Sequence, residues 1–184
     1  FLLFRRDLRL ALFLPTYSCK KLTDVTLNML RSMKAEAVFL DVDNTLAFHG
    51  SQEPFEGVVE WTQMVRQDGI SIIIMSNNLK SRVEPFAKKF DLPYVCFAQK
   101  PFPLGLPYAR KKLVRKSPDK IVVIGDQVYT DILGANLHGM QSVLLEPAAV
   151  EGSASFHFRR WLEKPVRRKL HRLAQKAKGD QAGQ

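Results

Sequence analysis

The sequence Ala37-Val-Phe-Leu-Asp-Val-Asp-Asn-Thr45 decides the fold, because within it an apolar run ends abruptly at two aspartates. Residues 37–40 have the character of a buried β-strand, and the carboxylates of Asp41 and Asp43 follow two positions apart. Side chains two apart in an extended chain point the same way. Ligands of open α/β sheets bind at the carboxyl ends of strands. Because two like charges held close together favour a divalent cation, the stretch predicts a magnesium-dependent site.

Apolar segments of two kinds alternate along the 184 residues. Short β-rich runs predict strands over 37–41, 70–75, 94–97, 120–124 and 142–146. Helical spacing predicts helices over 22–33, 55–67, 81–90, 104–116 and 129–138, the first of them capped by Thr23 or Asp24. Connections are short and leave no room for an inserted second domain. The alternation predicts an α/β protein with three α/β/α layers and a mostly parallel five-stranded sheet.

The net charge of +10 is concentrated at the two ends of the chain. Between Phe158 and Lys178 nine basic residues accompany one acidic residue, and the first 21 residues contain five against one. Such asymmetry indicates a polyanionic partner, either a membrane surface or nucleic acid. Since no apolar run reaches the roughly 20 residues of a spanning helix, residues 1–14 are expected to lie on a bilayer surface or to pack on the domain. Residues 155–178 predict a separate basic amphipathic appendage.

Polar groups suited to one reaction follow four of the predicted strands. They are Asp41 and Asp43, then Ser76 and Asn77, then Lys100, and finally Asp126 with nearby Asp131. Carboxylates suit a hard cation such as Mg2+, and hydroxyl, amide and ammonium groups suit phosphate oxygens. Each residue alone has a plainer interpretation, since an aspartate after a strand often caps a helix and a lysine is normally solvated. Their order at successive strand ends favours the functional interpretation.

Four motifs in this order resemble those of the haloacid dehalogenase (HAD) superfamily of phosphatases. The motifs are Asp41-Val-Asp-Asn-Thr45, Ser76-Asn-Asn78, Lys100-Pro101 and Gly125-Asp-Gln-Val-Tyr-Thr-Asp131, within a similarity spanning about residues 37–146. The finer details are similar to the capless class III phosphatases that include phosphatidylglycerophosphate phosphatases. Gln99 departs from that pattern, which has Arg before the Lys-Pro pair, and this puts the substrate contacts in doubt. The resemblance implies a Rossmann-like HAD fold with no cap domain.

The resemblance also implies the chemistry of the acidic residues. Asp41 is the expected nucleophile, which forms an aspartyl-phosphate. Asp43 is the expected general acid for the leaving group and the base for the attacking water. The expected Mg2+ ligands are Asp41, the backbone carbonyl of Asp43, and Asp126.

The remaining site residues have supporting roles in the same resemblance. Ser76, the Asn77 amide and Lys100 are expected to bind the transferred phosphoryl group, where most of the catalysis lies. Asp131 is expected to support the metal shell or to orient Lys100. Thr45 is expected to brace the loop.

Three segments are expected: a basic amphipathic lead-in over 1–34, a HAD-like phosphatase domain over 35–150, and a basic amphipathic tail over 151–184. Basic ends would hold an open site against an anionic phospholipid membrane surface, at about 1 kcal/mol per basic residue. We therefore expect a lipid phosphate substrate, phosphatidylglycerophosphate by resemblance. The expected location is peripheral to a membrane, on the cytoplasmic face in a bacterium or inside an organelle.

Two other functions are compatible with the sequence. One is a phosphatase for a soluble phosphate ester or a phosphoprotein, and the other is a binding protein whose basic tail contacts RNA or ribosomes. Nucleic acid is the less favoured partner, because the sequence has no RNA-binding motif and little aromatic interleaving. The oligomeric state stays open.

Overall fold

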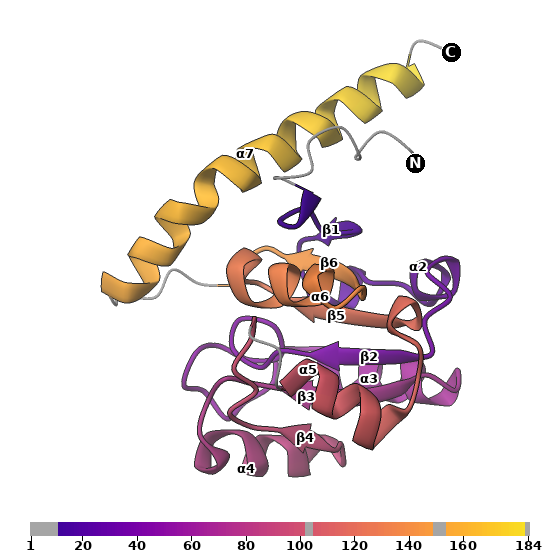
Figure 1. Ribbon diagram of the computed structural model, residues 1–184, viewed down its shortest axis with the longest axis vertical. Coiled ribbons are helices and arrows are strands. Elements are labelled where there is room, and N and C mark those ends of the chain that lie inside the picture. The colour runs from indigo at the N-terminus through magenta and orange to yellow at the C-terminus, as the bar shows by residue number, and fades with distance from the viewer. Residues whose placement is uncertain (1–10, 102–104, 149–153, 183–184) are drawn as a thin grey trace.

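The computed structural model describes residues 11–101, 105–148 and 154–182 (Figure 1). Its strands are β1 (Tyr17–Cys19), β2 (Ala37–Leu40), β3 (Ser71–Met75), β4 (Tyr94–Val95), β5 (Ile121–Gly125) and β6 (Gln141–Leu145). Its α-helices are α2 (Leu27–Ser32), α3 (Val58–Gln67), α4 (Lys80–Phe90), α5 (Gly105–Tyr108), α6 (Leu133–Leu137) and α7 (Ala154–Ala182). Short 3-10 turns form η1 (Leu22–Asp24) and η3 (Pro118–Lys120), and π-helical turns form η2 (Ala109–Val114) and η4 (Val128–Ile132).

One parallel sheet organises the described chain, in the strand order β1-β6-β5-β2-β3-β4. β2 lies at its centre, with Leu40 in register with Ile74 of β3 on one side and Ile124 of β5 on the other. Strands covered on both faces are apolar throughout, as these are. Because the strands are parallel, their carboxyl ends all lie at one edge. The α/β class and the layered architecture are confirmed, with one strand more than the five expected.

Successive residues of β2 enter two different cores. Val38 and Leu40 face the core beneath α2, α3 and α4, whereas Ala37 and Phe39 face the core beneath α5 and α6. This separation follows from the two-residue period of a strand. The helices of the two cores lie on opposite faces of the sheet and make the three layers.

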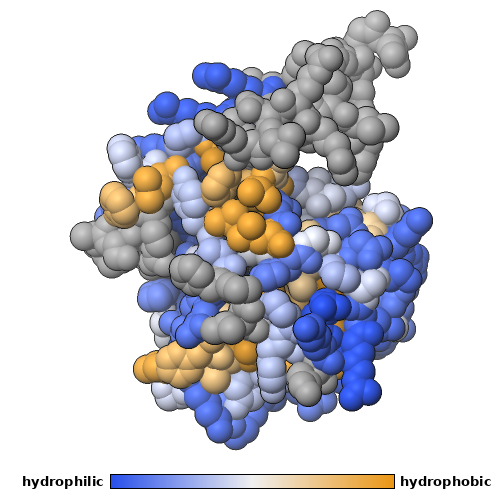
Figure 2. Space-filling view, in the orientation of Figure 1, coloured by the Kyte–Doolittle hydropathy of each residue, from blue (hydrophilic) through white to orange (hydrophobic). Residues whose placement is uncertain are grey.

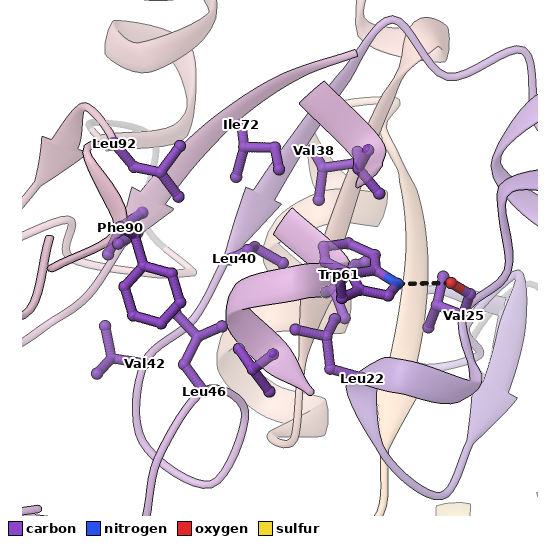
Figure 3. Close-up of a cluster of buried hydrophobic side chains, with 14 of the residues drawn as sticks. Leu22, Val25, Val38, Leu40, Val42, Leu46, Trp61, Ile72, Phe90 and Leu92 are labelled. Atoms are coloured by element: carbon purple, nitrogen blue, oxygen red, sulfur yellow. Dashed lines mark hydrogen bonds between the residues drawn. The ribbon is translucent and has the colours of Figure 1, made fainter. Parts of the chain in front are cut away.

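The larger core is closed at one end by Trp61 of α3. Its indole packs among aliphatic side chains that include Leu22 and donates Nε1–H to the Val25 carbonyl at 2.7 Å (Figure 3). A buried indole needs such a partner for its single donor. The bond fixes α3 against the segment that leads into α2.

Several elements differ from those expected, and three of these differences change how a segment is built. β1 was missed because three residues with a central serine show no clear period, yet they pair in parallel with β6. The helix expected over 22–33 is divided into η1 and α2, and its cap is Thr26, whose Oγ1 accepts the Met29 N–H at 3.2 Å. The helix expected over 104–116 is α5 followed by the π-helical η2, and Leu104 lies outside the described residues.

The expectation of a separate appendage over 155–178 is wrong, because α7 docks on the domain. Val166 is buried against Leu14, Ile132 and Leu144, and the carboxylate of Glu163, only 1% exposed, accepts the Val128 N–H at 2.8 Å. The apolar residues of α7 therefore do not share one face. Some bind the domain and others point outward, while the helix itself runs past the β1 edge of the sheet (Figure 1).

The expectation for residues 1–14 concerns mostly residues 1–10, which lie outside the described part of the chain. From residue 11 onward the chain packs on the domain: Asn136 donates Nδ2–H to the carbonyls of Leu12 at 2.8 Å and Leu14 at 3.0 Å. Phe13 meets the Tyr129 ring edge-on at 5.4 Å. None of the helices described is both long and apolar enough to cross a membrane.

Candidate active site

The residues predicted from the sequence converge at the carboxyl edge of the sheet. Asp41 directly follows β2, Ser76 follows β3 and Asp126 follows β5, while Lys100 reaches the same place from the loop after β4. All of them are buried, and Lys100 is only 5% exposed. Buried charges are stable only when paired, so the contacts within this cluster determine its chemistry.

The ammonium group of Lys100 joins three of these strand ends. Nζ donates to Asp41 Oδ1 at 2.8 Å, to Asp131 Oδ1 at 2.6 Å and to the Met75 carbonyl at 2.9 Å. An ammonium has three donors, so each is used. Asn77 holds the backbone of Lys100 from the other side: its Oδ1 accepts the Lys100 N–H at 2.8 Å and its Nδ2 donates to the Lys100 carbonyl at 3.1 Å. The side chain of Asn77 thus positions Lys100, and its contact with a phosphoryl group stays a prediction.

Burial and neighbouring charges of opposite sign act in opposite directions on the pKa values of Lys100 and Asp41. Burial disfavours the charged form of Lys100, but the carboxylates of Asp131 and Asp41 outweigh burial, and the pKa of Lys100 is raised. Burial raises the pKa of the Asp41 carboxyl, and although Lys100 opposes this, Asp131 and Asp126 reinforce it. The cluster therefore holds more negative charge than its lysine neutralises.

The end of β5 is shaped by a glycine. A Cβ on Gly125 would lie 2.2 Å from Asp131 Oδ2 and 2.4 Å from its Cγ. Asp131 occupies that space because it sits in the π-helical turn η4, which folds back over the strand end, and its Oδ2 accepts the Gln127 N–H at 3.2 Å. Turns of this kind are frequent at functional sites. Only glycine at 125 lets Asp131 lie beside Asp126.

Asp41, Asp126 and Asp131 together fit a divalent cation. One oxygen from each lies within 4.8 Å of the others, and all three residues are buried. Oδ1 of Asp126 is buried with no hydrogen-bond partner, as expected of an oxygen that serves a metal. Hard cations such as Mg2+ prefer carboxylate ligands of this kind. The carboxylate of Asp43 lies outside this group, and ligation through its backbone carbonyl stays a prediction.

The carboxylate of Asp43 has its own set of partners. Arg82 of α4 donates Nη2–H to Asp43 Oδ1 at 2.9 Å, the Gly50 N–H approaches the same oxygen at 3.4 Å, and Asn78 Nδ2 donates to Oδ2. His49 Nδ1 lies 3.6 Å from Oδ2. Asp41 and Asp43 therefore have different environments, one facing Lys100 and the other facing Arg82. Arg82 was not predicted, because only the fold brings the first turn of α4 to the end of β2. Asn78 belongs to the Ser76-Asn-Asn78 motif, but no role was predicted for it from the sequence.

A cavity of about 370 Å3 adjoins the loop that follows Asp43. Its walls are both apolar and basic, and include Phe48, Phe55, Lys20 and Lys21. Thr45 also lines it, with a buried Oγ1 that has no hydrogen-bond partner. Ser76 has a different setting, since its Oγ accepts the Asn78 N–H at 3.2 Å.

Comparison with known proteins shows the superfamily to which the chain belongs. A family model described as HAD-hydrolase-like matches residues 97–148, which contain Lys100 and the Gly125–Asp131 motif. A probable phosphatase, YqeG of Bacillus subtilis (strain 168), is 31% identical over 160 residues, which are 87% of this chain and 92% of that protein. The chain belongs to the HAD superfamily.

A solved structure of another protein is similar in fold. An uncharacterized protein from Listeria monocytogenes serotype 4b superposes with a TM-score of 0.54 at 16% identity, over 65% of this chain and 84% of that one. A haloacid dehalogenase-like hydrolase from Brucella suis 1330 gives a TM-score of 0.48 at 12% identity, over 65% and 92%. The names of these relatives specify no substrate.

Helix α7 adds a residue that the sequence did not assign to the site. Arg160 donates Nη1–H to the Asp126 carbonyl at 2.8 Å, and its Nη2 pairs with Asp126 Oδ2. Burial raises the pKa of Asp126 to about 6, against the opposing effect of Arg160. The tail contains nine basic residues, and nothing in the sequence distinguishes Arg160 from the other eight.

Proposed function

We propose that the chain is a phosphomonoester hydrolase that works through an aspartyl-phosphate on Asp41. The observation that carries this proposal is the buried contact of Lys100 with both Asp41 and Asp131, beside Asp126. Lys100 holds Oδ1 of Asp41 and leaves Oδ2 as the attacking atom. A carboxylate fixed in this way is a preorganised nucleophile. Membership of the HAD superfamily and similarity to a probable phosphatase support the same chemistry.

The reaction proceeds in two displacements. Oδ2 of Asp41 bonds to phosphorus, the ester P–O bond breaks, and the departing oxygen takes a proton from Asp43. Asp43 then removes a proton from water, whose oxygen attacks phosphorus and releases inorganic phosphate and the Asp41 carboxylate. Arg82 and Asn78 position Asp43 for both transfers. Lys100 and Ser76 stabilise the phosphoryl oxygens.

Asp41, Asp126 and Asp131 fit Mg2+, with the Asp43 carbonyl as a further ligand implied by the family. When bound, the ion would supply positive charge that reduces repulsion between the nucleophile and the phosphoryl group. Three buried carboxylates that each offer an oxygen to one position support a hard divalent cation.

For the substrate we propose a lipid phosphate, phosphatidylglycerophosphate in particular, met at an anionic membrane surface. Phe158 and Trp161 of α7 stack on each other at 6.1 Å and are 60% and 61% exposed. Lys164 and Arg168 follow at helical spacing from Trp161 and are also exposed. On the face shown in Figure 2, apolar residues form one group in the upper half and another at the lower left, with hydrophilic residues around them. Aromatic and basic side chains exposed together suit the interface of an anionic bilayer.

The assay that tests the reaction is phosphate release from phosphatidylglycerophosphate in mixed micelles with Mg2+, beside a panel of soluble phosphate esters. We expect turnover of the lipid, and none by the Asp41→Asn variant. Unchanged turnover by that variant would refute the nucleophile. Faster turnover of a soluble ester would refute the lipid substrate while keeping the chemistry.

Membrane contact is tested by point substitutions, because removing α7 would also remove its contacts with Asp126. The Phe158→Ala/Trp161→Ala variant should lose about tenfold or more in binding to phosphatidylglycerol vesicles in a flotation assay. Its control is Leu79→Ala/Leu137→Ala, which removes two exposed apolar side chains elsewhere. Equal loss in both variants would refute a membrane face on α7.

A further inference from the structure

Helix α7 holds Asp126 by both its backbone and its side chain. Arg160 donates Nη1–H to the Asp126 carbonyl at 2.8 Å, and Arg167 donates Nη2–H to the same oxygen at 2.6 Å. Arg160 alone also reaches the carboxylate, where its Nη2 pairs with Oδ2. The second carboxylate oxygen, Oδ1, is buried with no hydrogen-bond partner. One oxygen of Asp126 is thus fixed by α7, and the other is left for a ligand.

Buried Glu163 fixes the arginine itself. Its Oε2 accepts from Arg160 Nη1 at 2.7 Å and from Arg167 Nε at 3.0 Å, and its Oε1 accepts the Val128 N–H of η4 at 2.8 Å. The guanidinium group therefore has two carboxylates to bind, one on α7 and one at the end of β5. A rigid, planar guanidinium can serve both at once, whereas an ammonium cannot match that geometry.

Two effects of Arg160 on a cation at Asp126 oppose each other. Its positive charge repels the cation, but Glu163 already neutralises much of that charge at 2.7 Å. Its hydrogen bond to Oδ2 orients the carboxylate, and losing an outer hydrogen-bond partner of a metal ligand typically weakens metal affinity by about 10- to 100-fold. We therefore expect the hydrogen bond from Arg160 to strengthen metal binding more than its positive charge weakens it.

We infer that Arg160 is a positioning residue of the metal site, which holds the Asp126 carboxylate so that Oδ1 faces the cation. The tail helix is thereby part of the active site as well as a surface element. This inference rests on the metal site of the proposed function, but it concerns metal affinity and not turnover or substrate.

The test measures metal binding directly in the full chain, without substrate. Free Mn2+, which accepts the same oxygen ligands as Mg2+, is followed by its EPR signal, and Mg2+ is added as competitor. Arg160→Gln should weaken Mn2+ binding by about tenfold or more, which corresponds to about 1.4 kcal/mol per factor of ten. Arg160→Lys should recover part of the loss, because it restores one donor to Oδ2.

The matched control is Arg167→Gln. Arg167 anchors α7 through the Asp126 carbonyl and Glu163, whereas the hydrogen bond to the Asp126 carboxylate comes from Arg160, so loss of Arg167 loosens the helix and spares Oδ2. We expect less than about a threefold change in Mn2+ affinity for this variant. Arg168→Gln, at an exposed position, controls for the change in net charge.

Each outcome decides the inference. Equal weakening in Arg160→Gln and Arg167→Gln would overturn it and leave α7 as a structural brace. Unchanged Mn2+ binding in Arg160→Gln would overturn the inference by showing that Arg160 has no role in metal binding. Tighter binding would overturn it by showing that the charge of Arg160 competes with the cation. If Arg160→Gln is unfolded by circular dichroism, Arg160→Lys decides, and wild-type affinity in that variant would overturn the need for a guanidinium. Failure of the wild-type chain to bind Mn2+ or Mg2+ would instead remove the metal site of the proposed function, and this inference with it.

Discussion

Replacing Lys100 by methionine tests the centre of the site. Methionine keeps most of the volume of the side chain but removes its charge and its three hydrogen bonds. Asp41 and Asp131, whose oxygens both lie within 2.8 Å of Nζ, would then face each other without a cation between them. The substitution should therefore affect stability and chemistry together.

The size of the effect follows from burial. Breaking a buried ion pair by removing one partner costs about 3–5 kcal/mol, because the remaining charge is uncompensated. Protonation of Asp41, whose pKa burial already raises, limits the loss. We expect about 4 kcal/mol of lost unfolding free energy at pH 7.5 without metal, out of the roughly 5–15 kcal/mol of a typical domain. Turnover should fall by about a thousandfold.

Urea denaturation in the presence of EDTA measures the stability change. Lys116→Met is the control, since it makes the same substitution at a half-exposed ion pair with Glu36 and should cost less than about 1 kcal/mol. Adding Asp131→Asn to Lys100→Met should restore part of the loss, because it removes one of the two repelling carboxylates. A change below 1 kcal/mol for Lys100→Met, or further loss in the double variant, would refute the ion-pair account.

Three further predictions concern the residues around this centre. Gly125→Ala should displace Asp131, because the new Cβ would lie 2.2 Å from Oδ2, and should cost about 1–3 kcal/mol by thermal unfolding together with most of the metal affinity. Arg82→Gln should slow esters with poor leaving groups more than p-nitrophenyl phosphate, since Arg82 positions Asp43 and only poor leaving groups need its proton; equal slowing of both would contradict this. The pKa of Asp126 rises to about 6 on folding from 3.8, so its contribution to metal-free stability is complete below about pH 4 and is lost as pH rises through about 6. That loss is about 3 kcal/mol and should be absent in Asp126→Asn when denaturation midpoints are compared across this pH range.

The sequence predicted four charged residues that the structure brings together at the carboxyl edge of the sheet. Asp41 and Asp126 could be found because each directly follows an apolar strand, and parallel strands bring such positions to one edge. Lys100 and Asp131 lie further along the chain and were found through the Lys100-Pro101 pair and the Gly125–Asp131 motif. Arg82 could not be found in this way, because its contact with Asp43 joins residues 39 positions apart through the packing of α4. No local period signals such a contact.

The two aspartates of the opening motif show where sequence reasoning ends. The motif predicted that two carboxylates stand at the end of a buried strand, since an apolar run ends at them. Only the tertiary structure decided that one faces Lys100 and the other Arg82, because their surroundings come from different strands and helices.

Helix α7 also shows which properties of the tail follow from the sequence and which depend on the folded structure. Its basic character and helical spacing could be predicted from the sequence, because both are local properties of the chain. Its docking was not, because Val166, Glu163 and Arg160 are ordinary members of a basic amphipathic pattern until β5 and η4 offer them partners. Burial selects among residues that look alike in sequence, and burial is a property of the folded molecule alone.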